Sequence, residues 1–346
     1  MDRRKGRTLV RKRPSVDLHQ HDLTLDQLFE RFYSFKTSQG LRDRTLSEHR
    51  KLYGYFRDWL QQKIPHPKVG DITRETVQAY ITYMAQERVH YEGHTFNPAK
   101  NAPEVKVGLS PMTINIRLRA LKCFLKYGYD HGYFEENPIA GIKLFKTDED
   151  EIGSFTEQQV QKLLKACDRK TYAGFRDYTL MTLLLDTGLR ISEALSITNE
   201  MVDCNARLIT LSGKVTKNRK LRQVPISQET AKLIKQLQQD NTHFFHPDIP
   251  EQVFLTAFGD PLTPNIFSRR LKQYGQKAKI TGVRVSPHTF RHTFAKYYIL
   301  NGGDPFTLQN ILGHSTMDMV RKYVQMYSED VKIQHAKFSP LRRISR

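Results

Sequence analysis

The sequence predicts a multidomain, mainly α-helical protein that also contains a small antiparallel β-sheet. Its 346 residues exceed what one ordinary core needs, so two domains are expected. Apolar residues recur at helical spacing before residue 140 and again after 156. Two runs within 206–227, ARLITLSG and RQVPIS, flank a basic turn and have the pattern of an antiparallel hairpin.

The polar, Gly-punctuated stretch GIKLFKTDEDEIGSF separates the two helical regions and places a domain boundary near residue 148. The expected segments are a basic tail at 1–21, a helical domain at 22–147, a second domain at 148–328 and a C-terminal tail at 329–346.

Four amphipathic helices are expected in the first domain. Their predicted starts are Thr24, with Gln27 completing a capping box, Thr45 with Glu48, Thr73, and Ser110 followed by Pro111. The apolar stripes are Leu25, Leu28, Phe29 and Phe32; Tyr53, Phe56, Trp59 and Leu60; Val77, Tyr80, Ile81 and Met84; and Ile114, Leu118, Leu121 and Leu125. Residues 90–108 between the last two helices have the composition of an irregular surface loop.

The second domain opens at Thr156, which forms a capping box with Gln159. Helices are expected near 157–167, 175–187 and 191–197, then the hairpin, then further helices from about 228, with a short strand at 252–256. Ser286 and Pro287 predict another helix start.

Charge indicates the class of partner. Lys and Arg number 55 against 36 Asp and Glu, and this excess of 19 positive charges favours a polyanion, with nucleic acid first. On the helix after Ser110 a basic group lies off the apolar stripe: Arg117, Arg119, Lys122 and Lys126. These side chains suit DNA backbone contacts, although a merely solvated basic face has the same pattern.

No membrane association is expected. The longest apolar stretch, 178–185, is well short of the ~20 residues that a span needs. The N-terminus has no apolar signal-peptide core, so a cytoplasmic location is expected. Cys123, Cys167 and Cys204 have no metal-binding or disulfide spacing and are expected only to pack.

Four polar patches of the second domain carry candidate chemistry. They are Arg190 with Glu193 in GLRISE, the basic turn with Lys214, Lys217, Arg219, Lys220 and Arg222, His288 with Arg291 and His292 in SPHTFRH, and His314 with Tyr323 in LGHSTMDMVRKYV. Alone, the first is as well explained by a buried ion pair and the second by a solvated turn. His288 and His292 lie one turn apart, but no third ligand is near, which argues against zinc.

Together the patches suit a phosphodiester. Guanidinium groups deliver paired donors to phosphate oxygens, lysine or histidine can move protons, and a tyrosine can attack phosphorus and store the bond. No metal or nucleotide cofactor is then required, and the chain has no P-loop.

The order and spacing of these motifs resemble the tyrosine recombinases, the family of phage integrases and Xer-type site-specific recombinases. The matching elements are G-L-R-I-S-E at 188–193, H-x-x-R at 288–291, L-G-H at 312–314 and a tyrosine nine residues later. The run S-P-x-T-I-N-x-R-L-R-A-L at 110–121 resembles the family's helical, SAM-like core-binding domain, and residues 150–328 its α+β catalytic domain.

The resemblance implies a role for each residue. Tyr323 would be the nucleophile that forms a 3′-phosphotyrosyl bond, and Tyr327 competes for that role. Arg190, Arg291 and His314 would hold the non-bridging oxygens, His288 would transfer a proton, and Glu193 would orient Arg190 from behind. The family's hairpin lysine corresponds to Lys217 or, in an alternative alignment, to Lys214; Lys214 and Lys220 are otherwise expected to contact DNA.

The resemblance also implies a homotetramer on two DNA duplexes, with accessory DNA-bending or directionality proteins as further possible partners. Residues 329–346 would dock on a neighbouring subunit through Val331, Ile333 and Phe338, or form a plain basic tail. The short N-terminal tail favours a simpler recombinase, either Xer-like or transposon-encoded, and the long 90–108 loop favours an integrase or transposase of a mobile element. The alternatives are Xer-like chromosome or plasmid resolution, a type IB topoisomerase, and a DNA-binding regulator without activity.

Overall fold

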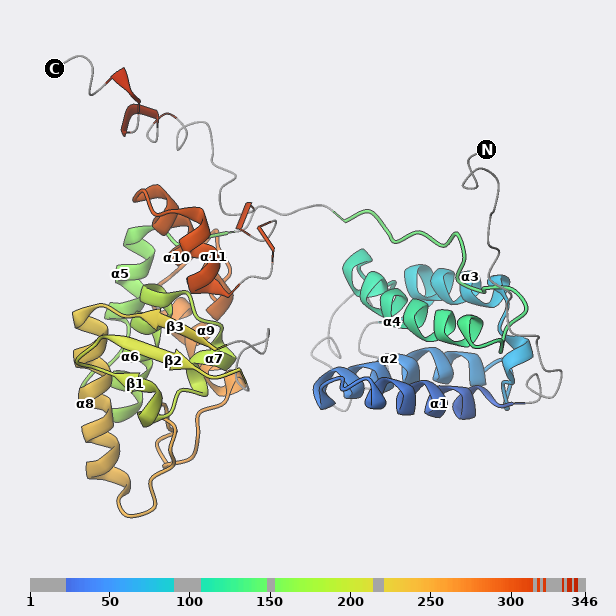
Figure 1. Ribbon diagram of the computed structural model, residues 1–346, viewed down its shortest axis with the longest axis horizontal. Helices are drawn as coiled ribbons and strands as arrows, with labels where there is room; N and C mark the ends of the chain where they lie inside the picture. Colours follow the sequence, from blue (N-terminus) through green and yellow to red (C-terminus); the bar gives the residue numbers. More distant parts are fainter. Residues whose placement is uncertain are drawn as a thin grey trace, which may run out of the picture. The chain divides into compact units, whose positions relative to one another are not determined.

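The computed structural model describes residues 23–89, 107–147, 153–213 and 221–313, together with positions 316, 317, 320, 321, 332, 335–337 and 339–341. The chain divides into two compact units, Met1–Glu149 and Asp150–Arg346, which are drawn in Figure 1. Both are mainly helical, and in the described residues the second adds a three-stranded antiparallel sheet. The predicted fold class is therefore confirmed. No helix in these ranges is long and apolar enough to cross a bilayer.

The first unit is a set of packed helices. They are α1 (Leu25–Ser38), α2 (Asp43–Gln61), α3 (Arg74–Thr82), continued by one π-helical turn (Tyr83–Glu87), and α4 (Pro111–Asp130). Thr24, Thr73 and Ser110 are N-caps, as predicted. The start predicted at Thr45 was wrong, because the N-cap of α2 is Arg42, three residues earlier, and Asp43 therefore lies at the positive end of the helix.

An aromatic cluster holds α1, α2 and α4 together. The Phe29 and Tyr53 rings stack with centroids 3.9 Å apart, and the Phe124 ring meets each edge-on at 5.5 Å. Such pairs contribute about 0.5–1.5 kcal/mol each beyond the area they bury. The predicted stripes are buried, except that Ile81 is only half-buried.

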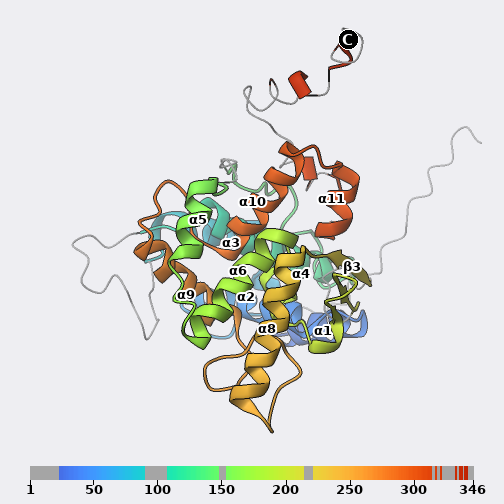
Figure 2. The ribbon, with the colours of Figure 1, turned by 90° about the vertical axis from the view of Figure 1, so that its left-hand side faces the viewer.

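The second unit surrounds a larger core. Its elements are α5 (Glu157–Lys165), α6 (Tyr172–Thr187), α7 (Ile191–Leu195), β1 (Val202–Asp203), β2 (Leu208–Leu211), β3 (Arg222–Pro225), α8 (Gln228–Phe245), α9 (Pro264–Lys277), α10 (Pro287–Leu300) and α11 (Pro305–Leu312). Helix α6 lies at the centre, packed against α8 and α10 (Figures 1 and 2).

The predicted hairpin is confirmed. Strands β2 and β3 pair antiparallel, with Leu208 opposite Pro225 and Leu211 opposite Arg222, and β1 adds a short third strand that was not predicted. The strand predicted at 252–256 was wrong, since this segment makes only isolated bridges. Its apolar residues are buried in the core as an irregular segment, and burial alone produced the strand-like pattern.

A saturated polar network ties α6 to α9. The Asp177 carboxylate, which has no exposed surface, accepts hydrogen bonds from Arg176, Arg270 and the Tyr274 hydroxyl. Arg176 also donates to the Leu255 carbonyl at 2.7 Å. Because the buried Asp177 carboxylate pairs with both arginines, its charge can be accommodated, and removing this carboxylate would leave the buried Arg176 without its counter-ion.

Candidate active site

The junction of α6 and α7 positions Arg190. Helix α6 ends at Gly188, whose φ of 61° lies in the left-handed region. A Cβ here would approach the Phe294 ring to 2.3 Å, so only glycine allows this close turn. Two residues later Arg190 caps α7, and its Nη1 donates to Glu193 Oε1 at 2.9 Å while its backbone N–H donates to Oε2 at 3.1 Å.

Arg291 reaches the same junction from α10. Its guanidinium is 3% exposed, and Nη1 donates to the Gly188 carbonyl at 2.7 Å while Nη2 donates to the Leu312 carbonyl at 2.9 Å. Segments that lie more than 100 residues apart in sequence are thereby joined through one side chain. The structure brings the two predicted arginines together.

The Leu312 carbonyl is the meeting point of three guanidinium groups. It accepts hydrogen bonds from Arg291, from Arg222 at 3.1 Å and from Arg190 at 3.4 Å. Leu312 is the last residue of α11, where the helix dipole is negative, and Gly313 follows with φ 63°. Among the described residues, three guanidinium groups meet here, and one carboxylate, Glu193, forms ion pairs with two of them, Arg190 and Arg222.

Arg222 is a member of this centre that the sequence did not identify as catalytic. The sequence groups it with the basic turn, for which a solvated surface is the simpler explanation, but its side chain is only 11% exposed and its Nη2 lies 3.0 Å from Glu193 Oε2. The strand pleat is the signal that could have identified it. Arg222 and the fully buried Val224 are two residues apart on β3 and share the inward face.

Glu193 is charged despite its burial. Burial alone would raise its pKa, but the charge of Arg222, and then the hydrogen bonds and charge of Arg190, outweigh that effect and hold the pKa below its ordinary value. The carboxylate therefore stays ionised at neutral pH and can orient Arg190.

Two histidines lie on the first turns of α10, which begins after the N-cap Ser286. His288 is exposed on one side, yet desolvation on its inner side and the charges of Arg291, Arg190 and Arg284 lower its pKa. His292 is half-buried, and burial together with His288 and Arg291 lowers its pKa to about 4. Both rings are thus neutral near pH 7. The described residues hold no cluster of metal-ligating side chains.

Comparison with known proteins identifies the chain. Residues 154–330 match the model of the phage integrase family, and residues 25–146 match the phage integrase SAM-like domain. The protein belongs to the phage integrase family. It is therefore a tyrosine recombinase, one of the enzymes that cut and rejoin DNA.

Curated tyrosine recombinases are recognisably similar over most of the chain. It is 30% identical to tyrosine recombinase XerC of Chlamydia caviae over 78% of each chain. It is 31% identical to tyrosine recombinase XerD of Pasteurella multocida over 64% of this chain and 74% of that one. The fold resembles that of the Tn1549 transposon integrase in complex with a circular intermediate DNA, with a TM-score of 0.68 and 18% identity over 92% and 100% of the two chains.

Several predicted residues of this tyrosine recombinase lie outside the described residues. They are Lys214, Lys217, Lys220, His314, Tyr323, the competing Tyr327, and the tail positions Val331, Ile333 and Phe338. Their roles stay predictions.

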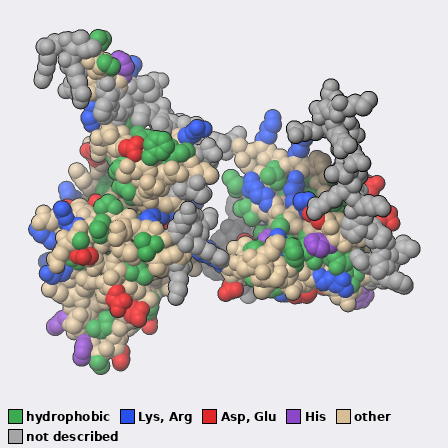
Figure 3. Space-filling view, viewed as in Figure 1, with side chains coloured by type: hydrophobic (Ala, Val, Ile, Leu, Met, Phe, Trp, Pro, Cys, Tyr) green, Lys and Arg blue, Asp and Glu red, His purple; other side chains and the backbone are tan. Residues whose placement is uncertain are grey.

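Three of the four basic side chains that were predicted to contact DNA from α4 make contacts within the protein. Several Lys and Arg side chains lie over α4 in Figure 3. The Arg117 guanidinium lies 3.9 Å from the centre of the Tyr55 ring, Lys122 donates to the Ile142 carbonyl, and Lys126 pairs with Asp130 at 3.0 Å. Arg119 is exposed. The structure thus leaves Arg119 fully presented to solvent and anchors the other three.

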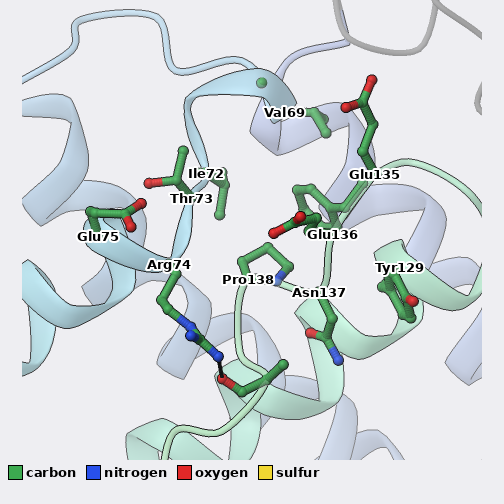
Figure 4. Close-up of a pocket in the computed structure, with 13 residues that line it drawn as sticks. Val69, Ile72, Thr73, Arg74, Glu75, Tyr129, Glu135, Glu136, Asn137 and Pro138 are labelled. Carbon is green, nitrogen blue, oxygen red and sulfur yellow. Dashed lines mark hydrogen bonds between the residues drawn. The ribbon is translucent and has the colours of Figure 1, made fainter.

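A separate pocket of about 660 Å³ lies in the first unit (Figure 4). It is formed by the start of α3 and the segment 134–140, and Arg74 crosses its edge to donate to the Ala140 carbonyl. Carboxylates from Glu75, Glu135 and Glu136 surround it, and none of the predicted site residues lines it.

Proposed function

We propose that this tyrosine recombinase binds double-stranded DNA as a homotetramer on two duplexes and exchanges their strands for a mobile element, as an integrase or transposase. The convergence of Arg190 and Arg291 on one helix end is the observation that carries the proposal. A surplus of positive charge at that point suits a phosphorane, which gains negative charge on its non-bridging oxygens. The length of segment 90–108, which the sequence predicts to be a loop, supports the mobile-element role.

The arginines would act on the scissile phosphate. Arg190 Nη1 is engaged by Glu193 and Leu312, and no described residue accepts a hydrogen bond from its Nη2 or Nε. These donors are therefore available for a phosphate oxygen, which a guanidinium binds with fixed geometry. Arg291 and His314 would complete the set around the same phosphate.

The covalent step would exchange one phosphate ester for another. The Tyr323 oxygen attacks phosphorus while the bond to the 5′-oxygen breaks, leaving a 3′-phosphotyrosyl link and a 5′-hydroxyl. Lys217, or Lys214 in the alternative assignment, gives a proton to the leaving oxygen. His288 takes the phenol proton, and its lowered pKa keeps the imidazole neutral, as a proton acceptor must be.

A nicked duplex that traps the covalent adduct tests this proposal. Wild type should form a protein–DNA adduct that survives denaturation, Tyr323→Phe should form none, and the matched Tyr327→Phe variant should behave as wild type. An adduct that persists in Tyr323→Phe would overturn the assignment of the nucleophile.

Xer-like resolution of chromosomes or plasmids is the second candidate, and the 30% identity to XerC of Chlamydia caviae favours it. Mapping cleavage on the DNA that flanks the encoding gene separates the two. Cleavage at the ends of a mobile element supports the first role, while cleavage at a single chromosomal or plasmid site supports the second. Relaxation of a supercoiled plasmid without any such site would instead indicate a type IB topoisomerase.

A further inference from the structure

The strand β3 contributes a guanidinium to the centre that the proposed chemistry does not use. Arg222 Nη2 donates to Glu193 Oε2 at 3.0 Å, and its Nη1 donates to the Leu312 carbonyl at 3.1 Å. Both acceptors are also bound by Arg190. Arg222 therefore contacts each group that holds Arg190.

The geometry of Gly313 shows how closely Arg222 fits. A Cβ on Gly313 would lie 1.8 Å from Arg222 Nη1, far inside the contact distance of two non-bonded atoms. The left-handed turn after α11 and the guanidinium thus occupy adjoining space. A residue with a Cβ at position 313 would therefore displace the Arg222 guanidinium.

Charge adds to this geometric role. Glu193 is 1% exposed, and burial would raise its pKa; the charge of Arg222 is the largest single effect that lowers the pKa, and Arg190 adds its charge and two hydrogen bonds. A neutral Glu193 could still accept one hydrogen bond, but it would lose the ionic attraction that draws Arg190 into place.

We propose that Arg222 is a positioning residue of the recombinase, which clamps Glu193 to the C-terminal end of α11 and thereby fixes Arg190 toward the phosphate. This inference rests on the proposed function of Arg190.

The first test separates cleavage from DNA binding. Arg222→Gln should slow single-turnover cleavage of the nicked duplex by about 10- to 100-fold, because a small misplacement of Arg190 is costly in the transition state. Arg222→Lys should recover part of the rate, since one ammonium can keep one of the two contacts. The matched control Arg269→Gln removes the same charge from an exposed position of α9 and should cleave as wild type. A rate in Arg222→Gln equal to that control would overturn the inference.

The second test asks whether Arg222 acts through Glu193. Because the two side chains form one unit, Arg222→Gln combined with Glu193→Gln should cleave no more slowly than the slower single variant. Losses that multiply would show independent roles and overturn the inference. If wild type forms no adduct, the proposed function is wrong, and the inference about Arg222 is tested by stability instead. Urea unfolding of wild type, the two single variants and the double variant measures the coupling between the two side chains. Additive losses of unfolding free energy would overturn the inference.

Discussion

Arg190 offers the cleanest residue-scale test of the site. Its side chain is 23% exposed, and Arg222 would still bind both Glu193 and the Leu312 carbonyl in its absence, so removal should leave folding intact. Arg190→Ala should lower single-turnover cleavage by about 10²–10³, as expected for a donor that acts mainly in the transition state. DNA binding, measured by titration of a labelled duplex, should change little. Cleavage close to the wild-type rate would remove Arg190 from the catalytic set.

Arg291 combines a catalytic prediction with a structural task. A lysine at this position cannot reach both the Gly188 and Leu312 carbonyls. The Leu312 carbonyl keeps its contacts with Arg222 and Arg190, whereas a buried Gly188 carbonyl that loses its donor costs about 1–3 kcal/mol. We therefore expect Arg291→Lys to lower the free energy of unfolding by that amount in urea titrations. An unchanged midpoint would mean that one contact suffices.

His292 should make stability depend on pH. Its pKa is lowered to about 4 in the folded protein, against an ordinary value of 6.5, so between these pH values the unfolded chain binds more protons. The free energy of unfolding consequently falls as the pH drops from about 6.5 to about 4, and this contribution is constant above 6.5. The ceiling is about 3 kcal/mol, which solvent screening of a half-buried ring reduces to about 1–2 kcal/mol.

Urea midpoints at pH 5 and pH 7.5 check this expectation. His292→Gln should reduce the difference between the two midpoints, whereas His243→Gln, at an exposed position of α8, should leave it unchanged. The same pH dependence in wild type and His292→Gln would contradict the assignment.

Individual contacts of the site could be predicted from the sequence where two residues of suitable type lie at a spacing that brings their side chains together. Arg190 with Glu193, three residues apart at a helix start, was predicted as a pair, and the structure contains that pair. Arg222 could not be separated from its basic neighbours by composition, because a charged residue that begins a strand is usually solvated. Only the face that it shares with Val224 distinguishes it.

Alanine substitutions at two glycines test the packing at the end of α6 and the interior of α2. Gly188→Ala places a methyl group against Phe294 in a left-handed conformation, and strain with overpacking should cost about 2–4 kcal/mol. Gly54 lies inside α2, and a methyl group added there would have nothing within 4 Å, so Gly54→Ala should stabilise by about 0.5–1 kcal/mol. Urea unfolding of both variants measures whether each substitution raises or lowers the free energy of unfolding. Destabilisation by Gly54→Ala, or a neutral Gly188→Ala, would contradict these expectations.

Elements were predictable where a local signal fixes them. Thr24, Thr73 and Thr156 each accept the hydrogen bond expected of an N-cap, because capping depends on residues three apart. The start of α2 was misplaced, since Arg42 makes no side-chain cap for a pattern to reveal. The segment at 252–256 was misread for a different reason. Tertiary burial requires apolar residues there whether or not a ladder forms.

At the scale of the whole molecule, the mainly helical composition was predictable, but the assembly of the centre was not. Arg190, Arg222 and Arg291 meet only because three separate segments pack against the end of α11. The periodicity of apolar residues predicts which side of each segment is buried, but it does not predict which segments lie next to one another. The family resemblance supplied that juxtaposition for Arg190 and Arg291, and physical reasoning from the residues alone left it open.

The two units also provide a way to follow each core separately. Among the described residues, their hydrophobic cores have no member in common. Trp59, the only tryptophan of the chain, lies in the first core with 3% of its surface exposed. Tryptophan fluorescence should therefore report unfolding of the first unit alone, while far-ultraviolet circular dichroism reports both. Gly54→Ala should move the fluorescence midpoint in urea upward. Gly188→Ala should lower the dichroism midpoint and leave the fluorescence midpoint unchanged. If Gly188→Ala moved both midpoints equally, the two cores would unfold as one cooperative unit, and the independence inferred from their separate residues would be wrong.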